Sequence, residues 1–412
     1  MRLLVLLSAL LIATASWAAD LGYQKDVAVK SPTRLDWIFV LANQSLPEAP
    51  AEWLGKYDST NQRYDYFAPE KPAAPKEGRA AILFISAGNE PAGWKNFEAT
   101  CRKQGIVFAS PHGAGNNTPM PQRVRIILDV LDDLRQREKI DPDRTYIAGF
   151  SGGGRVACAI AFALPEVFGG VIPVCAGGEL REEQWLRHRV ADRLSVAFLT
   201  GANDFNRGEI ERLRSPLLSA MGVRTKATVT PGLGHGIPND KVCEAAIKWL
   251  DEAAPARRKL ADKYPASRLK GDAVPSREAA SQLLLEEALA RAEQREARYS
   301  GLMQLMGIRT RWADLPAAQR ALEVLTKYER DPDRAWEEED IAEQRRALIA
   351  RARGLDAYGS GDLPAQYAKQ RPDMLQAAIE LWKQVIADGA DKAAVAEAQR
   401  RIPALEKLIK DK

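Results

Sequence analysis

One serine of this chain lies in a setting that could make it a nucleophile. Gly149, Phe150, Ser151, Gly152 and Gly153 form a G-x-S-x-G sequence that follows a predicted strand and precedes a predicted helix. Such a tight turn exposes the serine hydroxyl at the edge of a sheet, and the glycines avoid clashes there. The alternative is a phosphate-binding loop, but the pattern G-x-x-x-x-G-K-S/T is absent here. We therefore expect Ser151 to attack a carbonyl carbon.

A serine hydroxyl needs a base to activate it, and the base needs an acid to orient it. The chain has three histidines. His235 follows a strand predicted at residues 225–230 and lies in a glycine-rich loop, whereas His188 lies in a charged helical stretch and His112 precedes the serine. In hydrolases with this turn, the acid and then the histidine follow the serine along the chain. His235 is therefore the predicted base.

The predicted acid is Asp204. It comes directly after a strand predicted at residues 195–200, between the serine and the histidine. Asp192, Asp240 and Asp251 stay open as alternatives, although none of them ends a predicted strand at this point of the chain.

Two loops could donate hydrogen bonds to an oxyanion formed at the carbonyl. The Gly152 amide starts the helix after the serine, where free amides and a partial positive charge favour an anion. The second donor is expected in the loop after the apolar strand at residues 80–86, from the amide of either Ala87 or Gly88.

Substrate contacts are expected from loops at the same edge of the sheet. His112 lies in the glycine-rich loop at residues 111–117, and Asn89 lies in the loop after the apolar strand. We expect both side chains to bind substrate. No metal or organic cofactor is expected, because this chemistry needs none and the cysteines lack the spacing of a zinc site.

These residues need a sheet to position them, and residues 33–254 supply its pattern. Short apolar or β-branched runs alternate with helical stretches, which indicates an α/β fold with a mostly parallel sheet. The clearest helix is expected at residues 121–138. Strands are expected at residues 34–41, 63–67, 80–86, 106–110, 145–148, 170–174, 195–200 and 225–230.

The second half has a different composition. A proline- and glycine-containing linker is predicted at residues 255–275, between an α/β domain at 19–254 and an all-α domain at 276–412. Ala, Leu, Glu, Gln, Arg and Lys dominate this last region. Helices are expected near residues 277–306, 316–329, 336–353, 373–388 and 391–411.

The N-terminus resembles a secretory signal. An apolar run at residues 3–13 ends in small residues, with Ser16 and Ala18 at the positions that signal peptidase reads. The alternative, a membrane anchor, needs a run of about 20 apolar residues. Residues 1–18 are thus expected to be a signal peptide, and the protein is expected to be exported to the periplasm or secreted.

Export would permit disulfides among the four cysteines. Cys101 and Cys243 are the best-placed pair, because both fall near helices expected on one face of the sheet. Cys158 and Cys175 lie in apolar runs and could equally be buried thiols.

The chain is large, with 412 residues, of which 46% are hydrophobic. That fraction excludes a chain disordered throughout. Its 59 basic and 55 acidic residues nearly balance, which argues against a nucleic-acid partner. No later stretch of sequence is apolar and long enough to span a membrane.

The motifs together resemble a known group of enzymes. Three segments carry this resemblance: Ile140 to Gly153, the Gly201-Ala202-Asn203-Asp204 turn and the Pro231 to His235 loop. They are similar to segments of α/β-hydrolases of the polyhydroxybutyrate-depolymerase and feruloyl-esterase-like branch. The resemblance covers residues 60–254. It implies hydrolysis of a small-molecule or polymeric ester through an acyl-enzyme intermediate.

Two other functions stay open. A serine peptidase of the prolyl-oligopeptidase type would use the same three residues. A degenerate hydrolase would act as a binding or scaffold protein. The helical region at 276–412 is expected either to bind a protein partner or to cover the active site.

Overall fold

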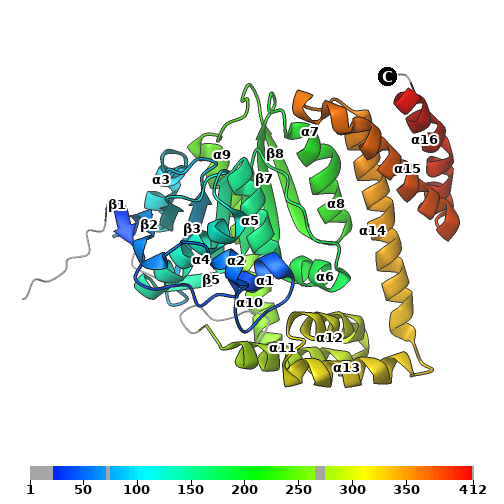
Figure 1. Cartoon of the computed structure of the whole chain (residues 1–412), viewed down its shortest axis with the longest axis horizontal. Helices are drawn as coiled ribbons and strands as arrows, with labels where there is room; N and C mark the ends of the chain where they lie inside the picture. The colour runs from blue at the N-terminus through cyan, green and yellow to red at the C-terminus, as the bar shows by residue number, and fades with distance from the viewer. Residues whose placement is uncertain (1–21, 71–74, 265–273, 411–412) are drawn as a thin grey trace, which may run out of the picture.

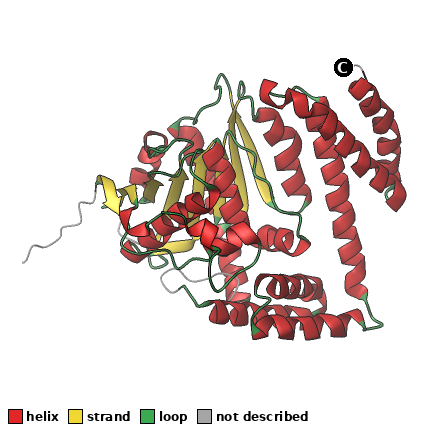
Figure 2. Cartoon of the chain, viewed as in Figure 1, coloured by secondary structure: helices red, strands yellow, loops and turns green. Residues whose placement is uncertain are grey.

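A computed structural model describes residues 22–70, 75–264 and 274–410. One sheet of eight strands lies at its centre, in the order β1-β2-β4-β3-β5-β6-β7-β8 (Figures 1 and 2). Strand β3 is parallel to both of its neighbours, β4 and β5, and the pairs β5-β6, β6-β7 and β7-β8 are parallel as well. Strand β2 is antiparallel to both of its neighbours, β1 and β4. The strands are β1 Tyr23–Ala28, β2 Arg63–Phe67, β3 Arg79–Ile85, β4 Val107–Pro111, β5 Ile140–Phe150, β6 Gly170–Val174, β7 Ser195–Gly201 and β8 Arg224–Thr230.

Helices cover both faces of the sheet. Side chains of α1, α4, α5 and α6 share one apolar core with the sheet, and side chains of α3 and α9 share the other. The described residues 22–70 and 75–264 form the α/β half of the protein, and those from 274 onward form the helical half. The helices of the α/β half are α1 Trp37–Ala42, α2 Ala51–Leu54, α3 Trp94–Gln104, α4 Met120–Arg137, α5 Gly152–Ala163, α6 Gln184–Arg193, α7 Arg207–Glu209, α8 Ser215–Ala220, α9 Asp240–Asp251 and α10 Ala254–Lys263. It also has a 3-10 turn, η1 Ser59–Asn61, and a π-helical turn, η2 Ile210–Arg214. This architecture is the predicted α/β-hydrolase fold, and the prediction is confirmed.

Helices joined by short loops, without any strand, make up the described part of the chain from residue 274 onward (Figure 2). They form two cores, one among α11, α12 and α13 and the other among α14, α15 and α16. The helices are α11 Arg277–Glu293, α12 Arg298–Arg311, α13 Pro316–Glu329, α14 Ala335–Ser360, α15 Arg371–Asp388 and α16 Lys392–Lys410, with 3-10 turns at η4 Arg295–Ala297 and η5 Ala365–Gln370. None of the described helices is long and apolar enough to cross a membrane.

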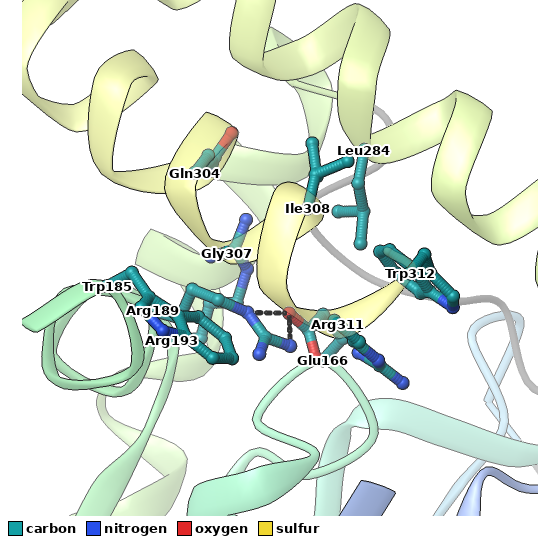
Figure 3. A pocket seen from close by; sticks show the side chains of 10 residues that line it. All are labelled: Glu166, Trp185, Arg189, Arg193, Leu284, Gln304, Gly307, Ile308, Arg311 and Trp312. Atoms are coloured by element: carbon teal, nitrogen blue, oxygen red, sulfur yellow. Dashed lines mark hydrogen bonds and ion pairs between the residues drawn. The ribbon is translucent and has the colours of Figure 1, made fainter. Parts of the chain in front are cut away.

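Buried ion pairs join the two halves. Glu287 of α11 accepts hydrogen bonds from Arg193 of α6 at 3.0 Å and from Arg291 at 2.6 Å. Arg311 of α12 pairs with Asp36 at 2.9 Å. A cavity of about 10 Å³ lies at this junction, where Figure 3 shows Arg189 bonded to Glu166 below α12. That volume has room for about one water molecule, so the junction is closely packed.

Several segments differ from the predicted elements. Strand β1 was not predicted, and the helix expected near 277–306 is divided into α11 and α12 by the turn η4. Residues 34–41 were expected to be a strand, but helix α1 begins at Trp37, because the Asp36 carboxylate accepts a hydrogen bond from the Phe39 amide and caps the helix. Within the expected linker, α10 occupies Ala254–Lys263, and Arg257 donates to the Asp143 carbonyl. The rest of that linker, up to residue 273, lies mostly outside the described residues, as does the predicted signal peptide.

The four cysteines are buried and free. The disulfide expected between Cys101 and Cys243 is therefore not formed, although α3 and α9 do pack together on one face of the sheet as expected. Burial, with a smaller contribution from Cys243, raises the pKa of Cys101 well above its usual range, so this thiol stays protonated.

Candidate active site

Ser151 occupies a strained turn between β5 and α5. Its backbone has φ 54° and ψ −121°, a conformation that residues other than glycine rarely adopt. The Ser151 amide donates to the carbonyl of Val174 on β6 at 2.8 Å, which ties the turn to the sheet. The sheet therefore holds the serine at the carboxyl ends of the parallel strands, as predicted.

The three residues predicted to act together form a hydrogen-bonded chain. His235 Nε2 lies 3.0 Å from Ser151 Oγ, and His235 Nδ1 lies 2.7 Å from Asp204 Oδ1. Asp204 follows β7 and His235 follows β8, so two neighbouring strand ends deliver them to the serine. The Asp204 side chain has no exposed surface, whereas 22% of the His235 side chain is exposed.

Hydrogen bonds keep Asp204 ionised. Thr200 Oγ1 donates to Asp204 Oδ2 at 2.6 Å, and the Asn206 amide donates to Oδ1 at 3.0 Å. Burial alone would raise the pKa of Asp204, but these bonds and the one from His235 lower it below its usual value. The carboxylate can therefore orient the imidazole and stabilise the imidazolium that forms when Ser151 loses its proton.

The oxyanion donors predicted from the sequence lie close together. An added Cβ on Gly153 would come within 2.2 Å of the Ile85 carbonyl, so the turn after Ser151 touches the end of β3. The Gly88 amide already donates to Ser86 Oγ at 3.1 Å, which leaves Ala87 as the better second donor beside Gly152.

Asn116 completes this side of the site, although the sequence identified only the loop that contains it. A Cβ on Gly152 would lie 1.9 Å from Asn116 Oδ1, so only glycine fits there. The Asn116 amide donates to the Ala87 carbonyl at 2.9 Å, and buried Arg123 donates to Asn116 Oδ1 at 3.3 Å. Asn116 thereby contacts both Gly152 and Ala87, whose amides are the two predicted oxyanion donors.

The two predicted substrate-binding residues, Asn89 and His112, make contacts between loops and edge strands, and their role in substrate binding stays a prediction. Asn89 Oδ1 accepts from the Gly115 amide at 3.2 Å, which joins two loops at the sheet edge. His112 Nε2 lies 3.2 and 3.3 Å from carboxylate oxygens of Asp26 and Asp65. The carboxylates turn the His112 ring toward the edge strands β1 and β2, which the sequence could not show because β1 was not predicted.

The other candidates for base and acid have structural partners. His188 is partly buried and lies 3.0 Å from Ser300 Oγ, and Asp192 pairs with Arg291 at 2.9 Å. Asp251 accepts from Arg144 at 2.7 Å. Asp240 begins helix α9. These four residues are not brought to Ser151.

Two aromatic rings that the sequence did not single out contact the base. The Phe205 ring stacks on His235 with centroids 4.1 Å apart and planes at 24°, and Phe150 lies at 4.9 Å. Phe205 is 46% exposed, which is unusual for so large an apolar side chain. Its place directly after Asp204 was the only sequence signal available.

Two groups of side chains have the composition of metal ligands. One is Cys175, Asp204 and His235, and the other is Asp26, Asp65 and His112. In the first group, direct hydrogen bonding of His235 to Asp204 leaves no room for an ion between them. Cys175 lies under this pair in a positive-φ conformation and donates to the Gly236 carbonyl at 3.2 Å.

Comparisons with known proteins reach part of the chain. No protein-family model matches it. A poly(3-hydroxybutyrate) depolymerase of Ralstonia pickettii is 25% identical over 133 residues, which is 26% of this chain and 27% of that protein. NocK of Nocardia uniformis subsp. tsuyamanensis, to which an esterase activity is ascribed, is 26% identical over 193 residues, or 43% and 52% of the two chains. The chain thus spans about half or less of these relatives.

Solved structures are similar over about half of the chain. The S-formylglutathione hydrolase of Staphylococcus aureus is 15% identical, with a TM-score of 0.36, and the match covers 46% of this chain and 90% of that one. A thermostable esterase is 18% identical with a TM-score of 0.37, over 46% and 59% of the chains. The strand order and the geometry around Ser151, rather than these scores, define the fold class.

Proposed function

We propose that the protein is a serine hydrolase that cleaves carboxylic esters. The observation that carries the proposal is the chain of hydrogen bonds from Ser151 through His235 to Asp204, at 3.0 and 2.7 Å. This chain lies at a strained turn, and the glycines after Ser151 contact the end of β3 and Asn116, beside the loop that holds the expected second oxyanion donor. The names of the curated relatives, a depolymerase of a polyester and an ascribed esterase, support an ester as the substrate.

In the proposed reaction, His235 removes the Ser151 proton as Oγ attacks the ester carbonyl carbon. The amides of Gly152 and Ala87 stabilise the oxyanion, and Asp204 stabilises the imidazolium. His235 then gives its proton to the departing alkoxide, which leaves as the alcohol. Water attacks the acyl-enzyme in the second half, with His235 again as base, and the carboxylic acid is released.

Turnover of p-nitrophenyl butyrate by the full chain tests this proposal. Ser151→Ala is expected to reduce turnover to the background rate, because the nucleophile is lost. Peptide p-nitroanilides are expected to be cleaved more slowly than the ester. Ester turnover that is unchanged in Ser151→Ala would refute the assignment.

We also propose export, on the basis of residues 1–18 alone. The measurement is the N-terminal sequence of the protein made in a bacterial host with a Sec pathway. Cleavage before Ala19 is expected, and an uncleaved chain in the cytoplasm would contradict the proposal.

A further inference from the structure

A partly buried ion pair joins the segments that follow the proposed nucleophile and acid. Arg155 lies four residues after Ser151 on α5, and Glu209 lies five residues after Asp204 at the end of α7. Arg155 Nη1 and Nη2 donate to the two carboxylate oxygens of Glu209 at 2.9 and 2.5 Å. Such a two-pronged contact restricts both distance and orientation. It therefore fixes α5 relative to α7.

The Glu209 carboxylate is held from several sides. Glu209 is 4% exposed, and its Oε1 also accepts from Arg214 Nε at 3.1 Å. An added Cβ on Gly177, after β6, would come within 2.5 Å of the same oxygen. Burial alone would raise the pKa of Glu209, but its bonds to Arg155 and Arg214 lower it, so the carboxylate stays charged.

The connection from Glu209 back to Asp204 is short and is held by several hydrogen bonds. The Arg207 amide donates to the Asp204 carbonyl at 3.1 Å, and the Ile210 amide donates to the Asn206 carbonyl at 3.2 Å. Asn206 also donates its side-chain amide to the Cys175 carbonyl at 2.9 Å. A displacement of Glu209 would therefore be transmitted to the loop that carries Asp204.

Helix α14 of the helical half supports this segment from outside. Figure 1 shows α14 running beside α8. The π-helical turn η2, which directly precedes α8 in the chain, also contacts α14. An added Cβ on Gly354 would lie 2.9 Å from Leu213, and one on Gly361 would overlap the Arg212 guanidinium. The absence of side chains at these two points lets α14 approach closely. Single π-helical turns occur often at functional sites.

We propose that Glu209 is a positioning residue, which with Arg155 fixes the loop of Asp204 relative to Ser151. Helix α14 holds η2, and thereby Glu209, in place. The helical half then contributes to the geometry of the site without touching the substrate. This inference rests on the proposed function, because it assumes that Ser151 and Asp204 work together.

The test compares Glu209→Gln with Glu166→Gln by the rate of Ser151 labelling with a fluorophosphonate, per folded molecule. Both substitutions remove a buried carboxylate that binds arginines. Glu166 is 3% exposed and bonds Arg189 of α6, beside the cavity that residues of α12 also line. Glu209→Gln is expected to slow labelling about tenfold, because a small displacement of reacting groups is costly. Glu166→Gln is expected to label at the wild-type rate.

A second readout separates positioning from folding. With p-nitrophenyl butyrate, Glu209→Gln is expected to lower kcat about tenfold and to change KM less than about twofold. If Glu209→Gln does not fold, Arg155→Lys, which keeps the charge but loses the two-pronged contact, is expected to slow labelling about threefold.

The outcomes distinguish the two proposals. If the wild type is labelled at Ser151 and both Glu209→Gln and Arg155→Lys react at its rate, the positioning role is overturned while the serine hydrolase stands. If both Gln variants slow equally, the effect is one of general stability, which also overturns it. An unlabelled wild type would refute the proposed function and this inference with it.

Discussion

At the scale of single residues, the order of three short motifs was enough to locate the proposed catalytic chain. Ser151, Asp204 and His235 each follow a predicted strand, and the carboxyl ends of parallel strands meet at one edge of the sheet. What the motifs could not show is the set of neighbours around them. Phe205, Asn116 and Glu209 depend on contacts between segments far apart in the sequence, such as the 54 residues that separate Arg155 from Glu209.

Replacement of Asp204 by asparagine tests the role of the acid. Asn cannot supply the charge that stabilises the imidazolium, and its amide can hold His235 in the wrong tautomer. We expect kcat for p-nitrophenyl butyrate to fall about 10⁴-fold with the protein still folded. Asp192→Asn, at a residue paired with Arg291, is the matched control and is expected to keep the wild-type kcat. Equal losses in both variants would exclude Asp204 as the acid.

Phe205→Ala tests the exposed ring that stacks on His235. An aromatic stack contributes about 0.5–1.5 kcal/mol, so kcat/KM for p-nitrophenyl butyrate is expected to fall between about two- and tenfold. The control is Met306→Ala, which removes another partly exposed apolar side chain, from α12, and is expected to leave kcat/KM unchanged. Wild-type kcat/KM in Phe205→Ala would show that the stack does not contribute.

At the scale of elements, the strands buried on both faces were the easiest to predict. The predictions for β6 and β7 agree with the structure to within one residue, because continuous apolar runs have few other placements. The edge strand β8 is only partly buried, but its alternating threonines and valine also placed it to within one residue. Strand β1 was missed because its exposed edge position allows polar residues throughout. Residues 34–41 were wrongly predicted as a strand, since a short apolar run does not distinguish a strand from a buried helix.

The contact between the end of α5 and helix α6 gives a pH-dependent prediction. Burial would raise the pKa of Glu166, but Arg189, Arg193 and Arg311 lower it to about 2. A pKa lowered on folding stabilises the protein above the unfolded value, about 4.5, and this stabilisation is lost as the pH falls toward 2.

The free energy of unfolding, measured by urea titration at several pH values, is expected to show this loss. In the wild type, about 3 kcal/mol should disappear between pH 4.5 and pH 2 through this group. Glu166→Gln should have a flatter profile over that interval and a lower stability at pH 7. Parallel profiles for the two proteins would refute the assigned charge state.

At the scale of the whole molecule, the helical half is an integral part of the structure. The sequence predicted a separate domain after a linker, because composition changes near residue 255. Composition cannot show that Arg193 of α6 pairs with Glu287 of α11, or that Arg311 of α12 pairs with Asp36. It also cannot show that α14 lies along η2 and α8. That the helical half covers the active site or binds a protein partner stays a prediction. Its packing against the α/β half adds a third role, which is to support the structure of that half.

Glu287→Ala tests this view of the two halves. The substitution leaves the guanidinium groups of Arg193 and Arg291 buried without their shared carboxylate. Breaking a buried ion pair in this way costs about 3–5 kcal/mol of unfolding free energy. Thermal unfolding should show a single, lowered transition for the whole chain. Two transitions, with the α/β half unfolding at the wild-type Tm, would mean that the halves are independent.

The central claim is that His235 activates Ser151 for nucleophilic attack. Its most direct test is labelling of the full chain with a fluorophosphonate, read by intact mass, in the wild type, Ser151→Ala and His235→Ala. One adduct is predicted in the wild type, none in Ser151→Ala, and labelling slowed by orders of magnitude in His235→Ala. A folded wild type that takes no label, or an adduct that persists in Ser151→Ala, would contradict the claim.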